Sequence, residues 1–119
     1  MNHHEENLQA SCVLWFRMQY PNYVLYSSLN GAMLNGTPLQ RAKTWNRLKK
    51  QGALEGVSDL FLMCARSGFN GLQIEMKFGK NKQSQEQIKF QQNCIKENYK
   101  YILCYNFDDF QKEIESYLS

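Results

Sequence analysis

The stretch that decides the fold runs Leu72-Gln73-Ile74-Glu75-Met76-Lys77, and it follows a second informative stretch, Glu55-Gly56-Val57-Ser58-Asp59-Leu60. Successive side chains on a strand point to opposite faces, so residues 72–77 predict a strand with one apolar and one polar face. The polar face carries Gln73, Glu75 and Lys77. The short polar link at 66–70 contains glycine, which predicts an antiparallel hairpin between the two strands.

This predicted hairpin gathers charge on one face of a sheet. Asp59 comes from the upstream strand, while Glu75 and Lys77 come from its partner. Burying such groups is costly unless their charges compensate each other or hold a cation. Two interpretations follow from the residues alone: a solvated strand face, which antiparallel sheets often have, or a metal site.

Three matching stretches carry a family resemblance: Gly56-Val57-Ser58-Asp59-Leu60, Glu75-Met76-Lys77 and residues 79–87. Upstream, residues 5–9, 30–31 and 48–52 match in the same order. In these residues the chain resembles the virus-type replication-repair nuclease (VRR-NUC) domain, a branch of the PD-(D/E)XK nuclease superfamily. Ser58 stands where the family usually has proline and Gln83 where it often has leucine. Neither departure removes a charged group.

The resemblance implies an α/β fold in which helices flank a mixed four-stranded sheet with a restriction-endonuclease-like core, as one domain over residues 1–119. It also implies a site. The implied catalytic residues are Asp59, Glu75, Lys77 and Gln87. The implied ligands of Mg²⁺ or Mn²⁺ are Asp59, Glu75, the Met76 backbone carbonyl and Glu5. Hard cations of this kind prefer oxygen ligands.

The activity implied by the resemblance is metal-dependent hydrolysis of DNA phosphodiesters by a homodimer, on branched or structured DNA in phage or prophage replication or repair. No small-molecule cofactor is expected. A competing hypothesis is a non-catalytic nucleic-acid-binding subunit with the same fold, although the intact Asp59, Glu75 and Lys77 argue against it. A third is an α/β interaction module, in which these residues form a surface ion cluster.

Two side chains have alternative roles. Glu5 lies at the centre of the apolar face of the first predicted helix, where it is either a carboxylate stabilised by the helix dipole or an acid directed at the metal. Glu6 is the second candidate for the family's acid in this helix. Gln87 lies three residues after Ser84, so it either completes a capping box or, as the resemblance implies, approaches the site.

The predicted order of elements is helix, strand, helix, strand, strand, helix, strand, helix. The helix that begins after Thr37-Pro38 should pack an inward stripe of four residues, Leu39, Ala42, Trp45 and Leu48. Its basic residues are either a solvated face or phosphate contacts. The predicted DNA-binding residues are Arg41, Lys43, Arg47, Lys49 and Lys50 of this helix, together with Lys80, Lys82 and Asn30. The alternative for Asn30 is that the Asn30-Gly31 pair only forms a turn.

Bulk composition fits one compact core. The chain has 119 residues, of which 43% are hydrophobic, and a net charge of +3 that permits contact with a polyanion. Its four cysteines are widely spaced, which favours buried free thiols over a disulfide framework or a zinc site. No apolar run reaches membrane-spanning length, and the first residues are polar. We therefore expect a cytoplasmic protein of a bacterial cell or of a phage-infected host cell.

Overall fold

The structure is a computed structural model, and it describes residues 3–29 and 34–119. The predicted order of helices and strands is confirmed. The elements are α1 (His3–Gln19), β1 (Val24–Ser27), α2 (Pro38–Lys50), β2 (Leu60–Met63), β3 (Leu72–Met76), α3 (Gln85–Lys96), β4 (Lys100–Cys104) and α4 (Phe107–Leu118). Within these residues no helix is both long and apolar enough to span a membrane.

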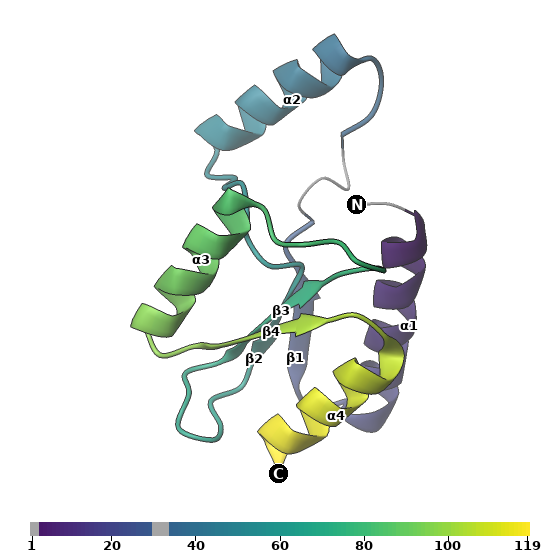
Figure 1. The fold of residues 1–119 in the computed structure, drawn as a ribbon, viewed down its shortest axis with the longest axis vertical. Helices are drawn as coiled ribbons and strands as arrows, with labels where there is room; N and C mark the ends of the chain where they lie inside the picture. The colour runs from purple at the N-terminus through teal and green to yellow at the C-terminus, as the bar shows by residue number, and fades with distance from the viewer. Residues whose placement is uncertain (1–2, 30–33) are drawn as a thin grey trace.

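The four strands form one mixed sheet in the order β1-β2-β3-β4 (Figure 1). The β1–β2 and β2–β3 pairs are antiparallel, whereas β3 and β4 are parallel and are joined through α3. The mixed four-stranded sheet and the hairpin predicted from the sequence are therefore confirmed. A parallel pair needs a long crossover, and α3 supplies it.

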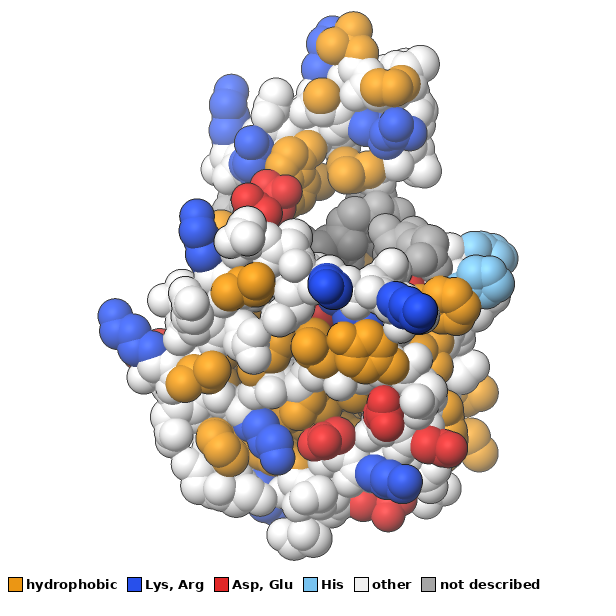
Figure 2. Space-filling view, in the orientation of Figure 1, with side chains coloured by type: hydrophobic (Ala, Val, Ile, Leu, Met, Phe, Trp, Pro, Cys, Tyr) orange, Lys and Arg blue, Asp and Glu red, His pale blue; other side chains and the backbone are white. Residues whose placement is uncertain are grey.

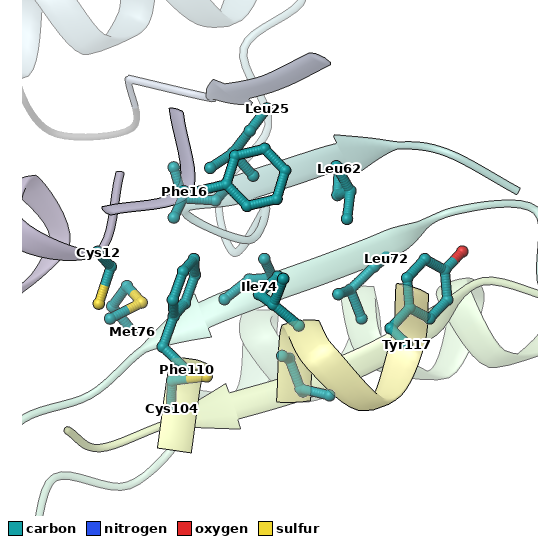
Figure 3. Packing of buried hydrophobic residues seen from close by; sticks show 13 residues of the cluster. Cys12, Phe16, Leu25, Leu62, Leu72, Ile74, Met76, Cys104, Phe110 and Tyr117 are labelled. Atoms are coloured by element: carbon teal, nitrogen blue, oxygen red, sulfur yellow. The ribbon is translucent and has the colours of Figure 1, made fainter. Parts of the chain in front are cut away.

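The core lies between one face of the sheet and the two helices α1 and α4 (Figure 3). The helix side of this core is formed by Cys12 and Phe16 of α1 and by Phe110 and Ile114 of α4, which are buried at helical spacing. The sheet side of the core is formed by Leu25, Leu60, Leu62, Leu72, Ile74, Met76, Ile102 and Cys104. All four cysteines are free thiols.

The helix α3 covers part of the opposite face of the sheet. Its Phe90 ring meets the Tyr101 ring of β4 edge-on at 6.4 Å between centroids. Tyr101 pairs with Gln73, which alternates with the core-facing Leu72 and Ile74. The polar strand face predicted from the sequence is thus the face on which α3 packs.

The α2 helix does not pack as predicted. None of its residues is buried, Leu39 is 65% exposed and Ala42 is exposed, while Trp45 and Leu48 are half-buried. The helix stands away from the sheet (Figure 1), because α1 with α4 and α3 already cover the two faces that an apolar stripe would need. Its start is stabilised locally by the Thr37 capping box.

The exposed position of α2 predicts unequal costs for two matched leucine truncations. Leu62→Ala, in the core at 0% exposure, should lower the free energy of unfolding by about 2 to 5 kcal/mol. Leu39→Ala on α2 should change it by about 0.5 kcal/mol or less, because no packing is lost. Chemical denaturation of both variants measures this, and a cost at Leu39 equal to that at Leu62 would contradict the observed packing.

Candidate active site

A cavity of about 440 Å³ gathers most of the residues predicted for the metal and the chemistry. Its wall is formed by Glu5, Leu34, Trp45, Glu55, Gly56, Val57, Asp59, Glu75, Met76, Lys77, Ser84 and Gln87. The Met76 side chain points into the core, where it is 1% exposed, so the cavity meets the Met76 backbone. Residues from α1, from α2, from the central hairpin and from the start of α3 therefore converge on one space.

Asp59 enters the cavity because of the strand register. Leu60 pairs with Ile74, so the next position along each strand sets Asp59 opposite Glu75. The Met76 backbone N–H donates to Asp59 Oδ2 at 2.7 Å, which replaces a ladder bond to the β2 backbone. Because the Asp59 side chain makes this bond, the backbone pairing of β2 begins one residue later, at Leu60.

Gln87 has both of the roles that the sequence left open. It completes the capping box, since its Oε1 accepts from the Ser84 backbone N–H at 2.9 Å. The same oxygen accepts from Lys77 Nζ at 2.8 Å, and Gln87 Nε2 donates to Glu75 Oε2 at 3.2 Å. Because two donors fix the amide oxygen, the amide nitrogen is left to face the Glu75 carboxylate.

Lys77 is held rigidly although it carries a charge. Its side chain is buried at 7% exposure, and Nζ also donates to the Lys82 backbone carbonyl at 3.2 Å. Both acceptors are neutral oxygens, so they orient the ammonium group without cancelling its charge. The charge remains available to a negatively charged group in the cavity.

The ionised form of Glu75 is strongly disfavoured in the site. Its carboxyl is 3% exposed, and Oε1 is a buried oxygen without a hydrogen-bond donor. Burial, together with the neighbouring Asp59, raises the pKa of Glu75 to about 9, while Lys77 acts in the opposite direction. Burial also raises the pKa of Asp59, whose carboxyl lies within hydrogen-bonding reach of Glu75. Two such carboxyls together require a proton or a cation.

The residues present fit a divalent metal ion. Gln87 donates to Glu75 Oε2, while Glu75 Oε1 has no hydrogen-bond donor. Glu75, Asp59 and the Met76 backbone border the same cavity. These are hard oxygen donors, which suit Mg²⁺ and Mn²⁺ better than soft metals. In residues 3–29 and 34–119, however, no three His, Cys, Asp or Glu side chains come together as a metal cluster. The protein therefore supplies two carboxylates, and solvent or substrate oxygens would complete the coordination.

Glu5 and Glu6 are separated by the structure. Glu5 lines the cavity with Asp59 and Glu75, and its negative charge raises the pKa of both. Its Oε1 accepts from Asn81 Nδ2 at 3.0 Å, which ties α1 to the loop after β3. Glu6 instead lines a different groove, beside the start of α1 and the end of β1. Of the two candidates, Glu5 is the acid of the cavity.

Gly56 allows two parts of the site to meet. Its φ of +90° is a left-handed conformation that glycine adopts readily. A Cβ at this position would lie 2.4 Å from the Glu86 carbonyl and 2.8 Å from the Gln87 backbone nitrogen. The segment leading to Asp59 therefore touches the first turn of α3, which carries Gln87.

The residues predicted to bind DNA are exposed, but they are divided between two places. Figure 2 shows Lys and Arg side chains over α2. Along its length this helix carries Arg41, Lys43, Arg47, Lys49 and Lys50. Lys80 and Lys82 lie on the loop after β3, next to the cavity. Asn30 lies outside the described residues.

Trp45 lines the cavity, a position that was not predicted from the sequence. The helical spacing of apolar residues on α2 placed it in the core, but it lines the wall of the cavity instead. Ser58 was also unassigned; its hydroxyl is buried and donates to the Gln73 side chain. For Trp45 the missed signal is the surrounding charge, because α2 has five basic residues and no acidic one.

These features define the chain as a nuclease-type α/β domain, and the comparisons agree. The family model of the VRR-NUC domain matches residues 3–108, so the chain belongs to the VRR-NUC family. A solved structure, a "VRR_NUC domain protein", has a similar fold, with a TM-score of 0.75, 20% identity, and coverage of 99% of this chain and 90% of that one. No curated protein matches the chain. The predicted family and fold class are confirmed, and the family as a whole uses divalent metals.

The raised pKa of Glu75 predicts that this residue destabilises the metal-free protein. Since the folded-state pKa, about 9, exceeds the ordinary value of 4.5, the folded state binds more protons between these values and loses stability as the pH rises. Glu75→Gln keeps the shape without the charge. At pH 8 in chelator it should raise the free energy of unfolding by about 2 kcal/mol.

Glu115, an exposed glutamate of α4, supplies the control for this measurement. Glu115→Gln should change stability by about 0.5 kcal/mol or less at every pH. The advantage of Glu75→Gln should shrink as the pH falls to 4.5 and below, because below that value Glu75 is protonated in both the folded and the unfolded wild type. If the free energy of unfolding of Glu75→Gln differed from that of the wild type by the same amount at pH 5 and at pH 8, Glu75 would not be the titrating group.

Proposed function

We propose that this protein is a metal-dependent endonuclease that hydrolyses DNA phosphodiester bonds with Mg²⁺ or Mn²⁺. The observation that carries the proposal is Glu75, which lines a cavity with Asp59 and Lys77 and whose buried Oε1 has no hydrogen-bond donor. Groups with strongly shifted pKa values cluster at functional sites, and burial raises the pKa of both neighbouring carboxyls, Glu75 and Asp59. Membership of the VRR-NUC family supports the same chemistry.

The proposed ligands are Glu75 Oε1, the Asp59 carboxylate and the Met76 backbone carbonyl, all of which border the cavity. A bound divalent cation supplies an activated water and offsets charge on the phosphate. Gln87 keeps Glu75 Oε2 occupied, so Oε1 is the oxygen left without a partner and the one proposed as the ligand. Glu5 adds negative charge near the ion and holds Asn81 of the neighbouring loop.

Lys77 is proposed to act on the reacting groups. Its ammonium group, fixed by Gln87 and by the Lys82 carbonyl, orients the attacking water and stabilises the negative charge that grows on the phosphate oxygens. In the reaction, the water oxygen forms a bond to phosphorus and the bond from phosphorus to one deoxyribose oxygen breaks. The water proton passes to solvent, and the departing oxygen receives a proton from solvent.

The α2 helix and the loop after β3 are proposed to hold the DNA backbone on either side of the cavity. Arg41, Lys43, Arg47, Lys49 and Lys50 supply the charge of α2, while Lys80 and Lys82 supply that of the loop. Contacts of this kind position the nucleic acid without reading its sequence. Asn30 completes the predicted set.

The setting of the activity is also part of the proposal. We place it on branched or structured DNA, in phage or prophage replication or repair, within the cytoplasm. A homodimer is proposed because Val24 and Met63, paired across β1 and β2, are exposed on a sheet face that α1 and α4 do not cover. Sedimentation equilibrium tests this: a mass of one 14.0 kDa chain at all concentrations would exclude the dimer.

Cleavage assays test the proposed activity directly. Labelled linear, nicked, flapped and four-way-junction DNA should be cut in Mg²⁺ or Mn²⁺ and not in chelator. Glu75→Ala and Lys77→Ala should each lower kcat/KM by roughly 100-fold or more, because a metal ligand or a charge on the transition state is lost. The ranking of the substrates should place flapped or branched DNA first.

Matched substitutions on α4 control for nonspecific effects in the cleavage assay. Glu115→Ala and Lys112→Ala remove the same charges from exposed positions outside the cavity and should leave cleavage unchanged. Binding without cutting in either metal would favour the non-catalytic subunit. Neither binding nor cutting would favour the interaction module.

The role of α2 predicts a change in the salt dependence of DNA binding. In the Glu75→Ala background, where DNA is not cut, Lys43→Gln together with Arg47→Gln should lower the slope of log K against log salt by about 2. Lys112→Gln should leave this slope unchanged, because α4 packs on the core face of the sheet and does not line the cavity. Equal slopes for all proteins would mean that α2 is only a solvated face.

A further inference from the structure

One aromatic side chain in the active-site cavity has no part in the chemistry above. We propose that Trp45 stacks on an unpaired base of the DNA substrate, and that this contact selects DNA with an unpaired nucleotide beside the cleaved phosphate. The inference rests on the proposed function and names its substrate class. Trp45 is here a specificity residue, not a metal ligand or a proton carrier.

The position of Trp45 supports a contact with substrate. It lines the cavity together with Leu34 and Val57, and the same cavity is lined by Asp59 and Glu75. At about 440 Å³ this space falls within the range of small-ligand sites, with room for one nucleotide. A phosphate held by the carboxylates through a cation would lie in the same cavity as the indole, so its own base, or the adjacent one, can reach the ring.

The packing of α2 leaves the indole available. No residue of α2 is buried, and Trp45 is only half-buried although tryptophan is among the most costly side chains to leave in contact with water. Among the aromatic pairs of the described residues, Trp15 contacts three other rings, whereas no ring pair includes Trp45. A base would supply the missing planar partner.

The charges around Trp45 fit a DNA strand. Arg41 and Lys49 lie four residues before and after Trp45, on nearly the same side of the helix, because each step of four residues turns by only about 40°. A phosphate backbone passing along α2 would meet a cation on each side of the indole. Alternating aromatic and basic side chains are typical of grooves that bind single-stranded nucleic acid.

An unpaired base is required because duplex DNA hides its aromatic faces. In an intact duplex, each base is covered above and below, so Trp45 can stack only on a terminal, flapped or extruded base. Extruding a paired base costs unstacking energy, whereas a flap or a single strand has already paid it. Stacking therefore favours substrates with a single-stranded segment at the cut.

Trp45 has an alternative role, as an apolar contact that holds α2 near Leu34 and Val57. The two roles differ in what they need from the side chain. Leucine preserves an apolar contact but has no aromatic face, while phenylalanine preserves both. Stacking predicts that Trp45→Phe retains most of the selectivity and that Trp45→Leu loses it, whereas an apolar anchor is served by either.

Fluorescence tests stacking without cleavage. The chain has two tryptophans, so Trp15→Phe leaves Trp45 as the sole reporter. In chelator, a short single-stranded oligonucleotide should quench Trp45 emission, and the blunt duplex of the same sequence should quench it far less. Equal quenching by both, or none by either when binding is seen by anisotropy, would overturn the proposal. This measurement does not require an active enzyme.

Cleavage then separates the stacking proposal from the proposed nuclease activity. With Mg²⁺, Trp45→Leu should lower kcat/KM on flapped DNA by about 5-fold to 100-fold, with Trp45→Phe close to wild type. Unchanged cleavage by Trp45→Leu would overturn the stacking role but leave the nuclease intact. Quenching without cleavage by any variant would overturn the nuclease and leave the contact intact. If Trp45→Leu fails to fold, the quenching result decides.

Discussion

The register of the β2–β3 hairpin is the constraint on which the site depends. Leu60 pairs with Ile74, and this pairing sets Asp59 opposite Glu75 while it turns the intervening apolar side chains toward α1 and α4. A shift of one residue would exchange the two faces, because side chains on a strand alternate. The same apolar pattern that builds the core therefore also places two carboxyls together on the opposite face.

Gln87 links the folding of a helix to the geometry of the chemistry. Its oxygen closes the first turn of α3 and also holds Lys77, while its nitrogen contacts Glu75. Gly56 permits that turn to approach the strand that leads to Asp59. Since one amide serves all of these contacts, the helix start and the cavity are built as a unit. A glutamine with only a capping role would have no such constraint on its orientation.

The site keeps groups that a stable core would not choose. Glu75 is buried with an oxygen that has no donor, and its raised pKa shows that the fold opposes its ionised form. Lys77 is buried as well, with neutral partners. Functional sites commonly accept such costs, because a charge held in a low-dielectric cavity acts strongly on a substrate. The remaining core supplies the stability that permits it.

The sequence by itself determined the order of elements, the hairpin, the inward faces of α1 and α4 and the capping boxes, because each depends on local spacing or on a few neighbouring residues. Only the tertiary structure decided which way α2 faces, since its apolar spacing was real but both sheet faces were already covered. It likewise placed Glu5 in the cavity and Glu6 outside it, and gave Gln87 two roles at once. These outcomes depend on contacts between residues far apart in the chain, which no local pattern contains.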